Sequence, residues 1–512
     1  MVGDYPNNKI VNLEELGQQA QRYRSEGLSV VLCHGTFDLI HPGHIRHLAK
    51  SREFGDRLLV TITADRFIKK GPGRPVFSAA LRAESLAALA VVDGVAIVED
   101  VTAIPAIRAV RPRVYAKGSD YVDPKGDVTG NIGREQAAVH EVGGEIRFTD
   151  GVTFSSSRLI NQHLDIFTPE TQAYLNDLKN AYNEKTILES IRGLGHRRIL
   201  VIGEAIIDEY CSTIPLGLTG KSNTVLACRY IETEQFAGGS LAVANHLAGF
   251  VSHVGLVAGI GRDERQNSFM KKALADNVNE NFFYYDTAPT LVKRRFVDSD
   301  IVKLFEVYYQ DPNPLTPRFE AEVCQWIAEN AGNYDAVIVA DYGNGLISPA
   351  MVEMICRHAR FLAVNTQINS GNHCHHVINR YPRADFISLN ECEVRLATHN
   401  RHAPMEKLAK DIAQRLSARW IAVTRGMKGA VLLDLTSGRT HDAPPLSTRV
   451  VDRIGAGDAF LALTGLCLAG GLPPEVALFV GSTAAAIDVQ IVCNRESIHP
   501  ISLYKYITTL MK

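Results

Sequence analysis

The chain has 512 residues, of which 46% are hydrophobic and 21% are charged, and its 40 glycines and 21 prolines are spread along the whole length. This composition excludes disordered and fibrous proteins, and the length predicts two or three compact domains. Because 54 Lys and Arg oppose 56 Asp and Glu, the net charge is −2, and no chain-wide positive field exists to hold nucleic acid or an anionic membrane.

The cysteines and the apolar runs indicate a cytoplasmic protein. The nine cysteines lie far apart and include no CxxC pair, which argues against a disulfide framework or a structural zinc site. The opening MVGDYPNNKIVNLEEL has no signal pattern, and glycines and prolines interrupt the longest apolar stretch, 460–481. We therefore expect a reducing compartment and no membrane span.

Apolar strands and helices alternate along the first part of the chain. A capped helix is predicted over 12–26, followed by the strand LSVVLCHGTFD and a helix over 44–54, and the alternation continues to the strand GEIRFTD. Such a β-α-β series requires a parallel sheet. We expect this first α/β domain to occupy residues 1–165.

A polar segment and a second α/β series follow. Residues 166–196 contain no apolar strand and are interpreted as a linker with one or two helices, whereas strands such as RRILVIGEA and YDAVIVADYG open a second domain over 197–512. Segments around CRYIETEQF and LVKRRFVDSDIVKLFEVYY are β-rich with no helix between them. They predict a small sheet that covers the main domain as a lid.

The first motif is GTFDLIHPGH, where a strand leads into a helix. Ligands of open α/β sheets bind at the carboxyl ends of strands, and free N–H groups at a helix start favour phosphate. His41 and His44 are separated by Gly43, which lets the backbone approach closely, so both imidazoles can stabilise charge on one phosphate.

This motif resembles the signature of the HxGH nucleotidyltransferases, which include glycerol-3-phosphate cytidylyltransferase and sugar-phosphate adenylyltransferases. The resemblance implies a Rossmann-like sheet in which His41 and His44 stabilise the α-phosphate of a nucleoside triphosphate while a substrate phosphate attacks it and pyrophosphate leaves. Matching segments are GRPVFSAALRAESLAAL, RVYAKGSDY and VTFSSSRLI. The nucleotide- and phosphate-binding residues implied by the family are Gly35, Thr36, Phe37, Gly43, Arg82, Lys117, Gly118, Asp120, Ser155, Ser156 and Ser157.

Within that family, residues 9–165 are most similar to the adenylyltransferase half of the bifunctional heptose 7-phosphate kinase/heptose 1-phosphate adenylyltransferases. KGSDY and the entry KIVNLEELGQQAQRYRSEG carry this likeness. It implies ATP as the nucleotide donor, with CTP as the alternative.

The second motif is DRIGAGDAF, which precedes the apolar helical run LALTGLCLAG. Small residues at a helix start present backbone N–H groups to the charge on a transferred phosphoryl group, and the carboxylate of Asp458 can accept a proton from an attacking hydroxyl. The pattern therefore predicts a phosphotransfer site without a Walker loop.

Residues 184–512 resemble the ribokinase-like (PfkB) sugar kinases, and DRIGAGDAF matches their C-terminal signature. The resemblance implies that Asp458 is the catalytic base, that Gly455, Ala456 and Gly457 form the anion hole, and that Mg²⁺ and ATP are used. FAGGSLAVANHLA, GEAIIDEY, LNECE and VTRGMKGA match further motifs of the family. These imply sugar contacts at Glu204, Asp208, Gly238, Gly239 and Asn245, nucleotide contacts at Thr424, Gly426 and Gly429, and an indirect link to the metal through Asn390 and Glu393.

Two positions depart from the kinase pattern. Glu204 stands where the family usually has Asp, and Ala242 or Val243 replaces the asparagine expected after the glycine pair, with Asn245 further along. A buried polar group that reads a sugar hydroxyl can discriminate strongly, so these departures bear on which sugar is used and not on the reaction class.

Together the motifs predict a bifunctional enzyme that makes an activated nucleotide sugar. The kinase would phosphorylate a sugar or sugar phosphate, such as a heptose 7-phosphate at C1, and the nucleotidyltransferase would couple the sugar 1-phosphate to a nucleoside triphosphate. Relative to the heptose enzymes, the domain order is reversed. The alternatives are a cytidylyltransferase/kinase pair acting on a polyol or pentose phosphate, and a protein in which one half is an inactive regulatory module. Because ribokinase-like lids often pair across a two-fold axis, we also expect a homodimer through the lid.

Overall fold

The computed structural model describes residues 7–68, 70–118, 131–149, 160–161, 166–220, 222, 224–372 and 375–512. Four residues named above, Asp120, Ser155, Ser156 and Ser157, lie outside these ranges. The chain forms two compact units, one of residues 1–168 and 504–512 and one of residues 169–503. The sequence-based boundaries instead assign all of 197–512 to the second domain.

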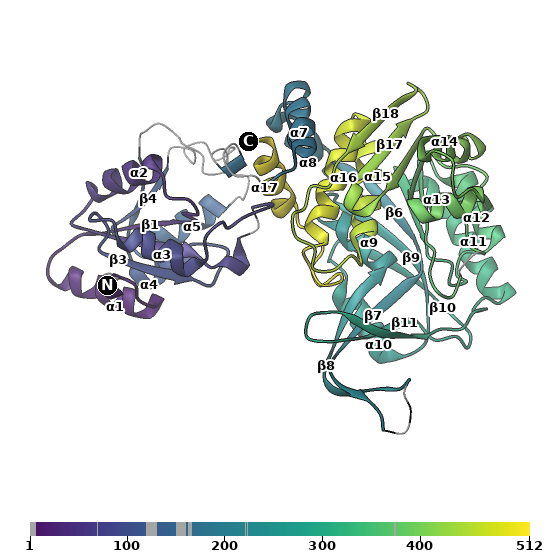
Figure 1. The fold of residues 1–512 in the computed structure, drawn as a ribbon, viewed down its shortest axis with the longest axis horizontal. Helices are drawn as coiled ribbons and strands as arrows, with labels where there is room; N and C mark the ends of the chain where they lie inside the picture. Colours follow the sequence, from purple (N-terminus) through teal and green to yellow (C-terminus); the bar gives the residue numbers. More distant parts are fainter. Residues whose placement is uncertain are drawn as a thin grey trace. The chain divides into compact units, whose positions relative to one another are not determined.

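The first unit contains a five-stranded parallel sheet of order β3-β2-β1-β4-β5. Its strands are β1 (Val30–Gly35), β2 (Arg57–Thr63), β3 (Gly94–Val98), β4 (Val114–Gly118) and β5 (Glu145–Thr149). Its helices, shown in purple and blue in Figure 1, are α1 (Leu13–Ser25), α2 (Pro42–Arg52), α3 (Ala79–Ala87), α4 (Ile104–Val110) and α5 (Asn131–Glu141). The predicted Rossmann-like α/β fold is confirmed.

Local signals explain where these helices begin. The Asn12 side chain accepts from the Glu15 backbone N–H at 2.8 Å and the Glu15 side chain accepts from that of Asn12 at 3.0 Å, a reciprocal cap that starts α1. Helix α2 has Pro42 in its first turn, where the missing N–H costs nothing. Apolar clusters cover both faces of the sheet, as the nearly continuous apolar strands require.

The second unit contains a nine-stranded sheet of order β10-β9-β6-β13-β14-β15-β16-β17-β18. The strands are β6 (Arg198–Gly203), β9 (His253–Ile260), β10 (Val278–Tyr284), β13 (Ala336–Asp341), β14 (Leu362–Thr366), β15 (Phe386–Asn390), β16 (Trp420–Thr424), β17 (Ala430–Asp434) and β18 (Arg439–Ala443). The strands from β10 to β16 run parallel, and β17 and β18 add an antiparallel edge.

Helices accompany this sheet, and the longest apolar ones are buried. They are α7 (Pro169–Ala181), α8 (Glu184–Arg192), α9 (Ser240–Ala248), α10 (Glu264–Ala273), α11 (Pro317–Asn330), α12 (Pro349–His358), α13 (Glu391–Thr398), α14 (Met405–Arg415), α15 (Ala456–Ala469) and α16 (Pro474–Asp488), and α17 (Pro500–Met511) follows. Nearly every residue of α15 and α16 is buried, which accounts for the apolar run at 460–481. Throughout the described ranges, no helix combines the length and apolar character needed to cross a bilayer.

The predicted lid is present as a separate four-stranded sheet of order β12-β11-β7-β8. It consists of β7 (Ala205–Leu218), β8 (Leu226–Gly239), β11 (Leu291–Val297) and β12 (Lys303–Tyr309). Strand β7 starts one residue after β6 ends, so the main sheet leads directly into the lid. Figure 1 shows the β7–β8 hairpin projecting away from the nine-stranded sheet.

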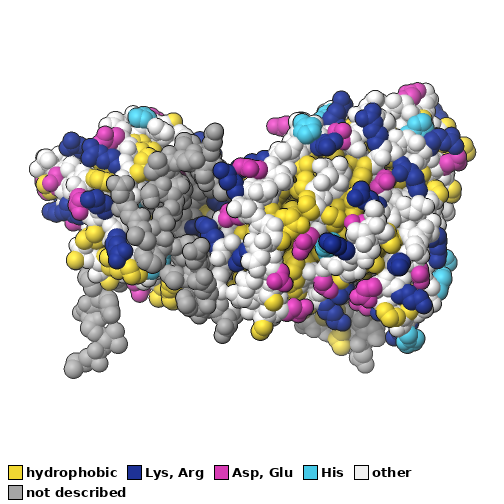
Figure 2. All heavy atoms as spheres, turned by 90° about the horizontal axis from the view of Figure 1, so that it is seen from above, with side chains coloured by type: hydrophobic (Ala, Val, Ile, Leu, Met, Phe, Trp, Pro, Cys, Tyr) yellow, Lys and Arg dark blue, Asp and Glu magenta, His cyan; other side chains and the backbone are white. Residues whose placement is uncertain are grey.

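Charges of both signs are interspersed on the face of the chain shown in Figure 2. This distribution agrees with the near-neutral net charge of −2. Any anionic substrate must therefore be held by local groups rather than by a general field.

Candidate active sites

The first site lies where the strand order of the first unit's sheet reverses. Strand β1 pairs with β2 on one side and β4 on the other, so the carboxyl ends of β1 and β4 flank the crevice in which doubly wound sheets bind ligands. The motif GTFDLIHPGH follows β1 directly, and Lys117 and Gly118 end β4. The topology thus brings the two segments to one edge of the sheet.

The motif loop is held in a tight conformation. Phe37 has φ +47, an unusual value for a residue with a large side chain, and its ring meets the His44 ring edge-on with centroids 5.2 Å apart. The His41 side chain caps α2 by accepting from the Gly43 N–H at 3.1 Å. As a result the His41 and His44 rings stack with centroids 4.0 Å apart, as expected for two imidazoles that serve one phosphate.

Burial keeps these histidines neutral. Desolvation lowers the pKa of His41, and it lowers the pKa of His44 to about 3, with the neighbouring His41 as the next cause. The pKa of His47 is lowered to about 4, first by burial and then by the Lys117 charge. At neutral pH the rings are therefore uncharged hydrogen-bonding groups, and a bound phosphate would favour their protonation.

Arg82 is placed differently from the expectation that it binds nucleotide. Its side chain is almost fully buried, and its guanidinium donates to the carbonyls of Phe77 at 3.0 Å, Thr36 at 2.6 Å and Thr63 at 2.9 Å, and to Asp65 at 2.6 Å. Four of its five N–H donors are thus used within the protein. Arg82 supports the motif loop through Thr36 instead of reaching into the crevice.

Lys117 is also engaged by the protein. Its ammonium lies 2.9 Å from the Glu135 carboxylate and 5.0 Å from the centre of the Tyr115 ring. It nevertheless sits close enough to the histidines to lower the pKa of His34 and His47. Gly118 beside it has open space around its Cα, which leaves room for a ligand.

The second site lies at the corresponding position of the nine-stranded sheet, where β6 pairs with β9 on one side and β13 on the other. A cavity of about 170 Å³ opens there. It is lined by Ile206, Asp208, Gly239, Lys293, Arg295, Tyr342, Gln367, Arg453, Ile454, Gly455, Gly457, Asp458 and Asn494. The sequence-predicted residues Asp208, Gly239, Gly455, Gly457 and Asp458 are thereby brought together.

Asp458 has the surroundings of a base. It lies in the first turn of α15, and the Tyr342 hydroxyl donates to its Oδ1 at 2.7 Å. Burial raises the pKa of Asp458 to about 7, and the Tyr342 hydrogen bond opposes part of that rise. A carboxyl group with this pKa can accept a proton from a hydroxyl near neutral pH.

Only glycine fits at the start of α15. Gly455 has φ +100, and a Cβ there would lie 2.4 Å from Asn494 Oδ1 and 2.7 Å from Asp488 Oδ2. A Cβ at Gly457 would meet nothing within 4 Å. The backbone N–H groups of this turn can thus receive a transferred phosphoryl group without side chains in the way.

Cations from the lid enter the same cavity. Lys293 and Arg295 project from β11, and Arg295 forms an ion pair with Asp208 on β7. The Lys293 side chain is buried beside the rings of Tyr308 and Tyr342, and desolvation is the first cause that lowers its pKa. In the described part of the chain, Lys293 has no carboxylate within ion-pair distance. Its ammonium is therefore a candidate receptor for an anion.

Three predicted sugar contacts, Glu204, Asn245 and Gly238, do not line the cavity. The Glu204 carboxylate accepts from the backbone N–H groups of Tyr342 at 3.0 Å and Asn344 at 2.9 Å, so it shapes the loop that carries Tyr342. The Asn245 side chain bonds the backbone of Ala273 and Ala275 at the end of α10. Gly238 lies under the Asp208 carboxylate, which would meet any Cβ placed there.

The predicted nucleotide turn borders a separate cavity of about 750 Å³. Thr424, Gly426 and Asn390 line it, whereas Gly429 has φ +76 and is pressed against the Ala443 carbonyl. Asn390 and Glu393 cap α13 reciprocally, at 2.9 Å and 2.7 Å, and burial raises the pKa of Glu393 to about 7. These side chains are used as caps and do not fit a direct metal site. Among the described residues, no group of three or more metal-ligating side chains gathers anywhere.

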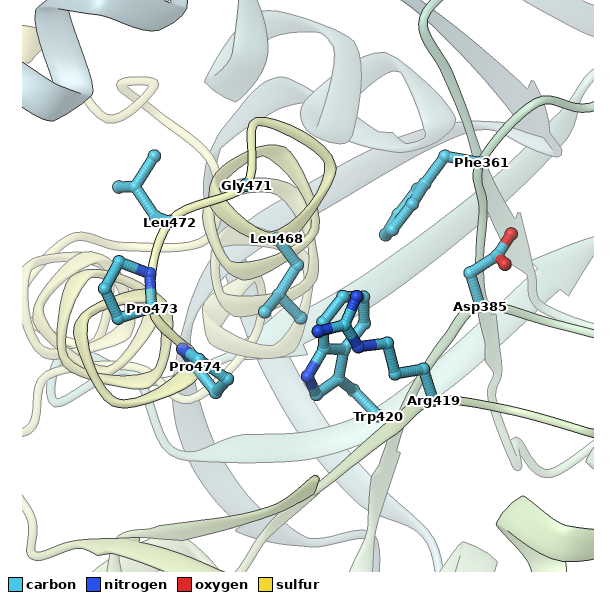
Figure 3. Close-up of a pocket in the computed structure, with 9 residues that line it drawn as sticks. All are labelled: Phe361, Asp385, Arg419, Trp420, Leu468, Gly471, Leu472, Pro473 and Pro474. Carbon is cyan, nitrogen blue, oxygen red and sulfur yellow. The ribbon is translucent and has the colours of Figure 1, made fainter. Parts of the chain in front are cut away.

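A further cavity, of about 430 Å³, lies away from this chemistry. Phe361, Asp385 and Arg419 stand at or just before the amino ends of β14, β15 and β16, and Leu468 is in the last turn of α15 (Figure 3). The Arg419 guanidinium stacks 4.1 Å from the centre of the Trp420 ring. Since Asp458 is in the first turn of α15, this cavity is not the catalytic one.

Sequence reasoning did not single out Tyr342, Lys293, Arg295, Arg453 or Asn494. A signal existed for the first three, because Tyr342 directly follows the apolar strand YDAVIVAD and the two cations alternate in LVKRRFV, which places them on one face of a strand. No pattern in the sequence marks Asn494.

Comparison with known families identifies two regions of the chain. The family model described as "pfkB family carbohydrate kinase" matches residues 196–497, and the model described as "Cytidylyltransferase-like" matches residues 32–175. The two matches coincide with the regions that carry Asp458 and the histidine pair, respectively.

Curated relatives match the nucleotidyltransferase-like region. The "Bifunctional protein HldE" of Methylobacillus flagellatus is 39% identical over 159 residues, 31% of this chain and 31% of that protein. The protein of the same name from Koribacter versatilis is 40% identical over 157 residues, 30% of this chain and 31% of its own length. The match to these relatives thus spans about a third of their length.

Two solved kinase structures are similar to part of the chain. Phosphofructokinase-2 from Escherichia coli is 15% identical with a TM-score of 0.49, covering 61% of this chain and 99% of its own. Ribokinase from Thermotoga maritima is 18% identical with a TM-score of 0.45, covering 62% of this chain and 99% of its own.

Proposed function

Because the chain belongs to the pfkB family of carbohydrate kinases, whose model spans residues 196–497, we propose that its second unit transfers the γ-phosphoryl group of ATP to a sugar hydroxyl. One observation carries the proposal. Asp458, with a pKa near 7 and a hydrogen bond from Tyr342, lies in one cavity with the glycine turn that starts α15.

In this reaction Asp458 accepts the proton of the attacking hydroxyl. The N–H groups of Gly455, Ala456 and Gly457 at the start of α15 stabilise the charge on the transferred phosphoryl group. Tyr342 holds the carboxylate in place, and Glu204 holds the loop that carries Tyr342. Mg²⁺ is expected to arrive on the phosphates of ATP, because Asn390 and Glu393 are occupied as helix caps.

The acceptor in this proposal is a sugar that already carries a phosphate. Lys293, Arg295 and Arg453 all border the cavity, and among the described residues Arg295 alone of the three forms ion pairs, with Asp208 and Glu306. Local cations of this kind suit an anionic substrate on a chain with no overall positive field. We propose a heptose 7-phosphate phosphorylated at C1, in keeping with the resemblance of the first unit to heptose enzymes.

The first unit in this proposal couples ATP to the C1 phosphate of the resulting sugar bisphosphate, or of the sugar 1-phosphate that remains once the distal phosphate has been removed. The sugar phosphate oxygen attacks the α-phosphorus, the bond to the β-phosphate bridging oxygen breaks, and pyrophosphate leaves. His41 and His44 stabilise the charge that develops on the α-phosphate. The product is an activated nucleotide sugar, made with the transferase ahead of the kinase in the chain, the reverse of the order in the heptose enzymes. The dispersed free cysteines favour action in the cytoplasm.

One finding favours a second candidate. The matching family model is described as cytidylyltransferase-like, which favours CTP as donor, and the acceptor in this candidate is a polyol or pentose phosphate. A regulatory module with one inactive half is less well supported, since His41, His44 and Asp458 are all present in ordered sites.

A product screen tests the proposal. The protein is incubated with ATP, Mg²⁺ and a panel of sugar phosphates, with CTP replacing ATP in parallel, and products are identified by mass spectrometry. We expect a sugar bisphosphate as the first product. If an added phosphatase removes the distal phosphate, the final product should be an ADP-sugar, and if no phosphatase is added, it should be an ADP-sugar phosphate. Faster turnover of CTP than of ATP with the same sugar 1-phosphate would select the second candidate. If no acceptor gains a phosphoryl group from ATP, the kinase assignment is refuted.

A further inference from the structure

The first unit is built from both ends of this sequence. Residues 504–512 group with residues 1–168, although every residue between 169 and 503 groups with the second unit. They form the larger part of α17. We call Tyr504–Lys512 the return segment.

One side chain ties the return segment to a loop of the first unit. Asn161 Nδ2 donates to the Thr509 carbonyl at 2.8 Å, and Asn161 Oδ1 accepts from Arg74 Nη2 at 2.6 Å. Asn161 and Thr509 are both buried. A single amide group therefore links Arg74 to the return segment.

The backbone of the same loop lies directly against α17. Gly71 has φ +103, and a Cβ built there would be 3.2 Å from Thr509 Cγ2 and 3.7 Å from Tyr506 Cδ2. Any larger residue would be strained and crowded at this position. Gly71 thus lies directly against the return segment, and Arg74 is linked to it through Asn161.

The other end of the loop is attached to the histidine motif. Asp38, within GTFDLIHPGH, accepts from the backbone N–H groups of Val76 at 2.7 Å and Phe77 at 3.2 Å. Arg82 adds a second link by bonding both the Phe77 and the Thr36 carbonyls. Loop 70–77 is therefore held between the motif on one side and the return segment on the other.

The loop and the return segment concentrate positive charge beside the motif. Burial lowers the pKa of Lys70 to about 8, and Lys505 and Lys512 are the next largest causes, opposed by Asp38. Burial likewise lowers the pKa of Arg74 to about 10. Like charges that lie close together repel one another, and a bound anion reduces this repulsion.

We propose that the return segment is a positioning element of the nucleotidyltransferase: it holds loop 70–77 against the histidine motif, so that the cations of the loop bind the phosphate groups of the substrates. The inference rests on the proposed function of the first unit. Because His41 and His44 belong to a different segment, loss of the return segment should weaken substrate binding much more than the chemical step.

Two variants of the full chain separate this role from general stability. The first ends at Leu503 and lacks the return segment. The second, Asn161→Asp, keeps the acceptor for Arg74 but replaces the donor to Thr509 with a carboxylate oxygen. Asn12→Asp is the matched control, since aspartate caps α1 as well as asparagine does and Asn12 touches neither the loop nor the return segment.

Amide hydrogen exchange and steady-state kinetics with ATP and a sugar 1-phosphate are measured on each protein. We expect exchange at residues 70–77 to rise about tenfold or more in both variants while β1 stays protected, as expected when one local unit opens. The KM values should rise about tenfold or more with kcat within about threefold, and the kinase activity, measured as an internal reference, should stay within about twofold.

Unchanged exchange at 70–77 in both variants would overturn the inference, and so would a fall in kcat at constant KM with faster exchange throughout the first unit. If the intact chain transfers no nucleotidyl group, the proposed function fails by itself. The exchange data then still decide whether the return segment holds the loop.

Discussion

The pKa of Asp458 near 7 has a direct consequence for the kinase reaction. Burial favours the neutral carboxyl group, so the basic form is present above about pH 7 and is lost as the pH falls through that value. We expect kcat/KM for sugar phosphorylation to be constant above about pH 8 and to fall about tenfold per unit below about pH 6. Initial rates across pH 5–9 at saturating ATP would check this, and a flat profile down to about pH 5 would contradict Asp458 as the base.

Tyr342 should influence the pH dependence of the kinase reaction. Its hydroxyl donates to Asp458 and lowers the carboxyl pKa, so Tyr342→Phe should raise the pKa and move the midpoint of the profile to higher pH. Loss of a hydrogen bond to a charged group should also lower kcat about tenfold. Tyr284→Phe, at an exposed tyrosine, is the matched control. A lower kcat with an unmoved midpoint would show that Tyr342 does not act through Asp458.

A variant of Glu204 can distinguish a direct contact with the sugar from a structural role. Because its carboxylate accepts from two backbone N–H groups of the 342–344 loop, Glu204→Gln would place an amide N–H against one of them. We expect unfolding free energy to fall by about 1–3 kcal/mol, with the sugar KM changed less than about twofold. Thermal unfolding and kinetics on the same preparation test this. A tenfold higher KM for the sugar at unchanged stability would show that Glu204 contacts the sugar.

These residues show what a motif can and cannot predict. The motifs predicted the histidine pair, Asp458 and the glycine turn as site residues, and the structure places both groups at helix starts, because spacing along one helix start determines where such groups lie. Sequence reasoning assigned ligand roles to Arg82, Asn390 and Glu393, but Arg82 bonds three backbone carbonyls and Asp65, and Asn390 and Glu393 cap α13. Residue type alone does not reveal whether a donor is already satisfied, since the partner comes from a distant segment.

The predicted homodimer interface lies on the lid sheet. On its β7–β8 hairpin, Leu216, Leu218 and Tyr230 are 66%, 61% and 61% exposed, an apolar surface of the kind that marks an interface. Introducing two lysines there, Leu216→Lys with Leu218→Lys, should give a monomer in sedimentation at micromolar concentration, whereas the unmodified chain should sediment as a dimer.

Met427→Lys is the control for that experiment, since Met427 is 61% exposed but lies outside the lid. It should leave the dimer intact. A monomeric unmodified chain would refute the prediction, and a dimer that survives both lysines would place the interface elsewhere.

Most elements were predictable because their apolar patterns are strong. Strands buried on both faces appear as short apolar runs, and the lid was recognisable because no helix separates β7 from β8 or β11 from β12, although α9 and α10 lie between the two pairs. The return segment was not predictable. The run PISLYKYITTLM is helical by pattern, but nothing in it specifies which of two sheets it joins.

At the scale of the whole molecule, each unit has its own main sheet in which the order of the strands reverses, and each carries one candidate site at that point. The Asp458 cavity is lined by residues between 206 and 494, and the described residues predicted for the histidine site lie between 35 and 118. Each reacting group therefore belongs to a separate compact unit, and we expect the two half-reactions to be separable by mutation.

Two variants of the full chain test this separation. Asp458→Asn removes the base but keeps its shape, so sugar phosphorylation should fall about 10²–10⁴-fold while nucleotidyl transfer to a supplied sugar 1-phosphate is unchanged. His44→Ala should do the reverse, because loss of one group that stabilises the α-phosphate costs about 3–4 kcal/mol of transition-state energy. The second variant should accumulate phosphorylated sugar.

Mixing the two variants gives the decisive measurement. If the intermediate diffuses freely, equal amounts should restore nucleotide-sugar formation after a lag that shortens as total protein rises, because the intermediate must build up in solution before the second site is occupied. The unmodified chain at half the total concentration is the reference for the final rate. A mixture that stays inactive, with each half-reaction still measurable in its own variant, would mean that the intermediate passes within one molecule. Loss of both half-reactions in either folded variant would instead contradict two independent sites.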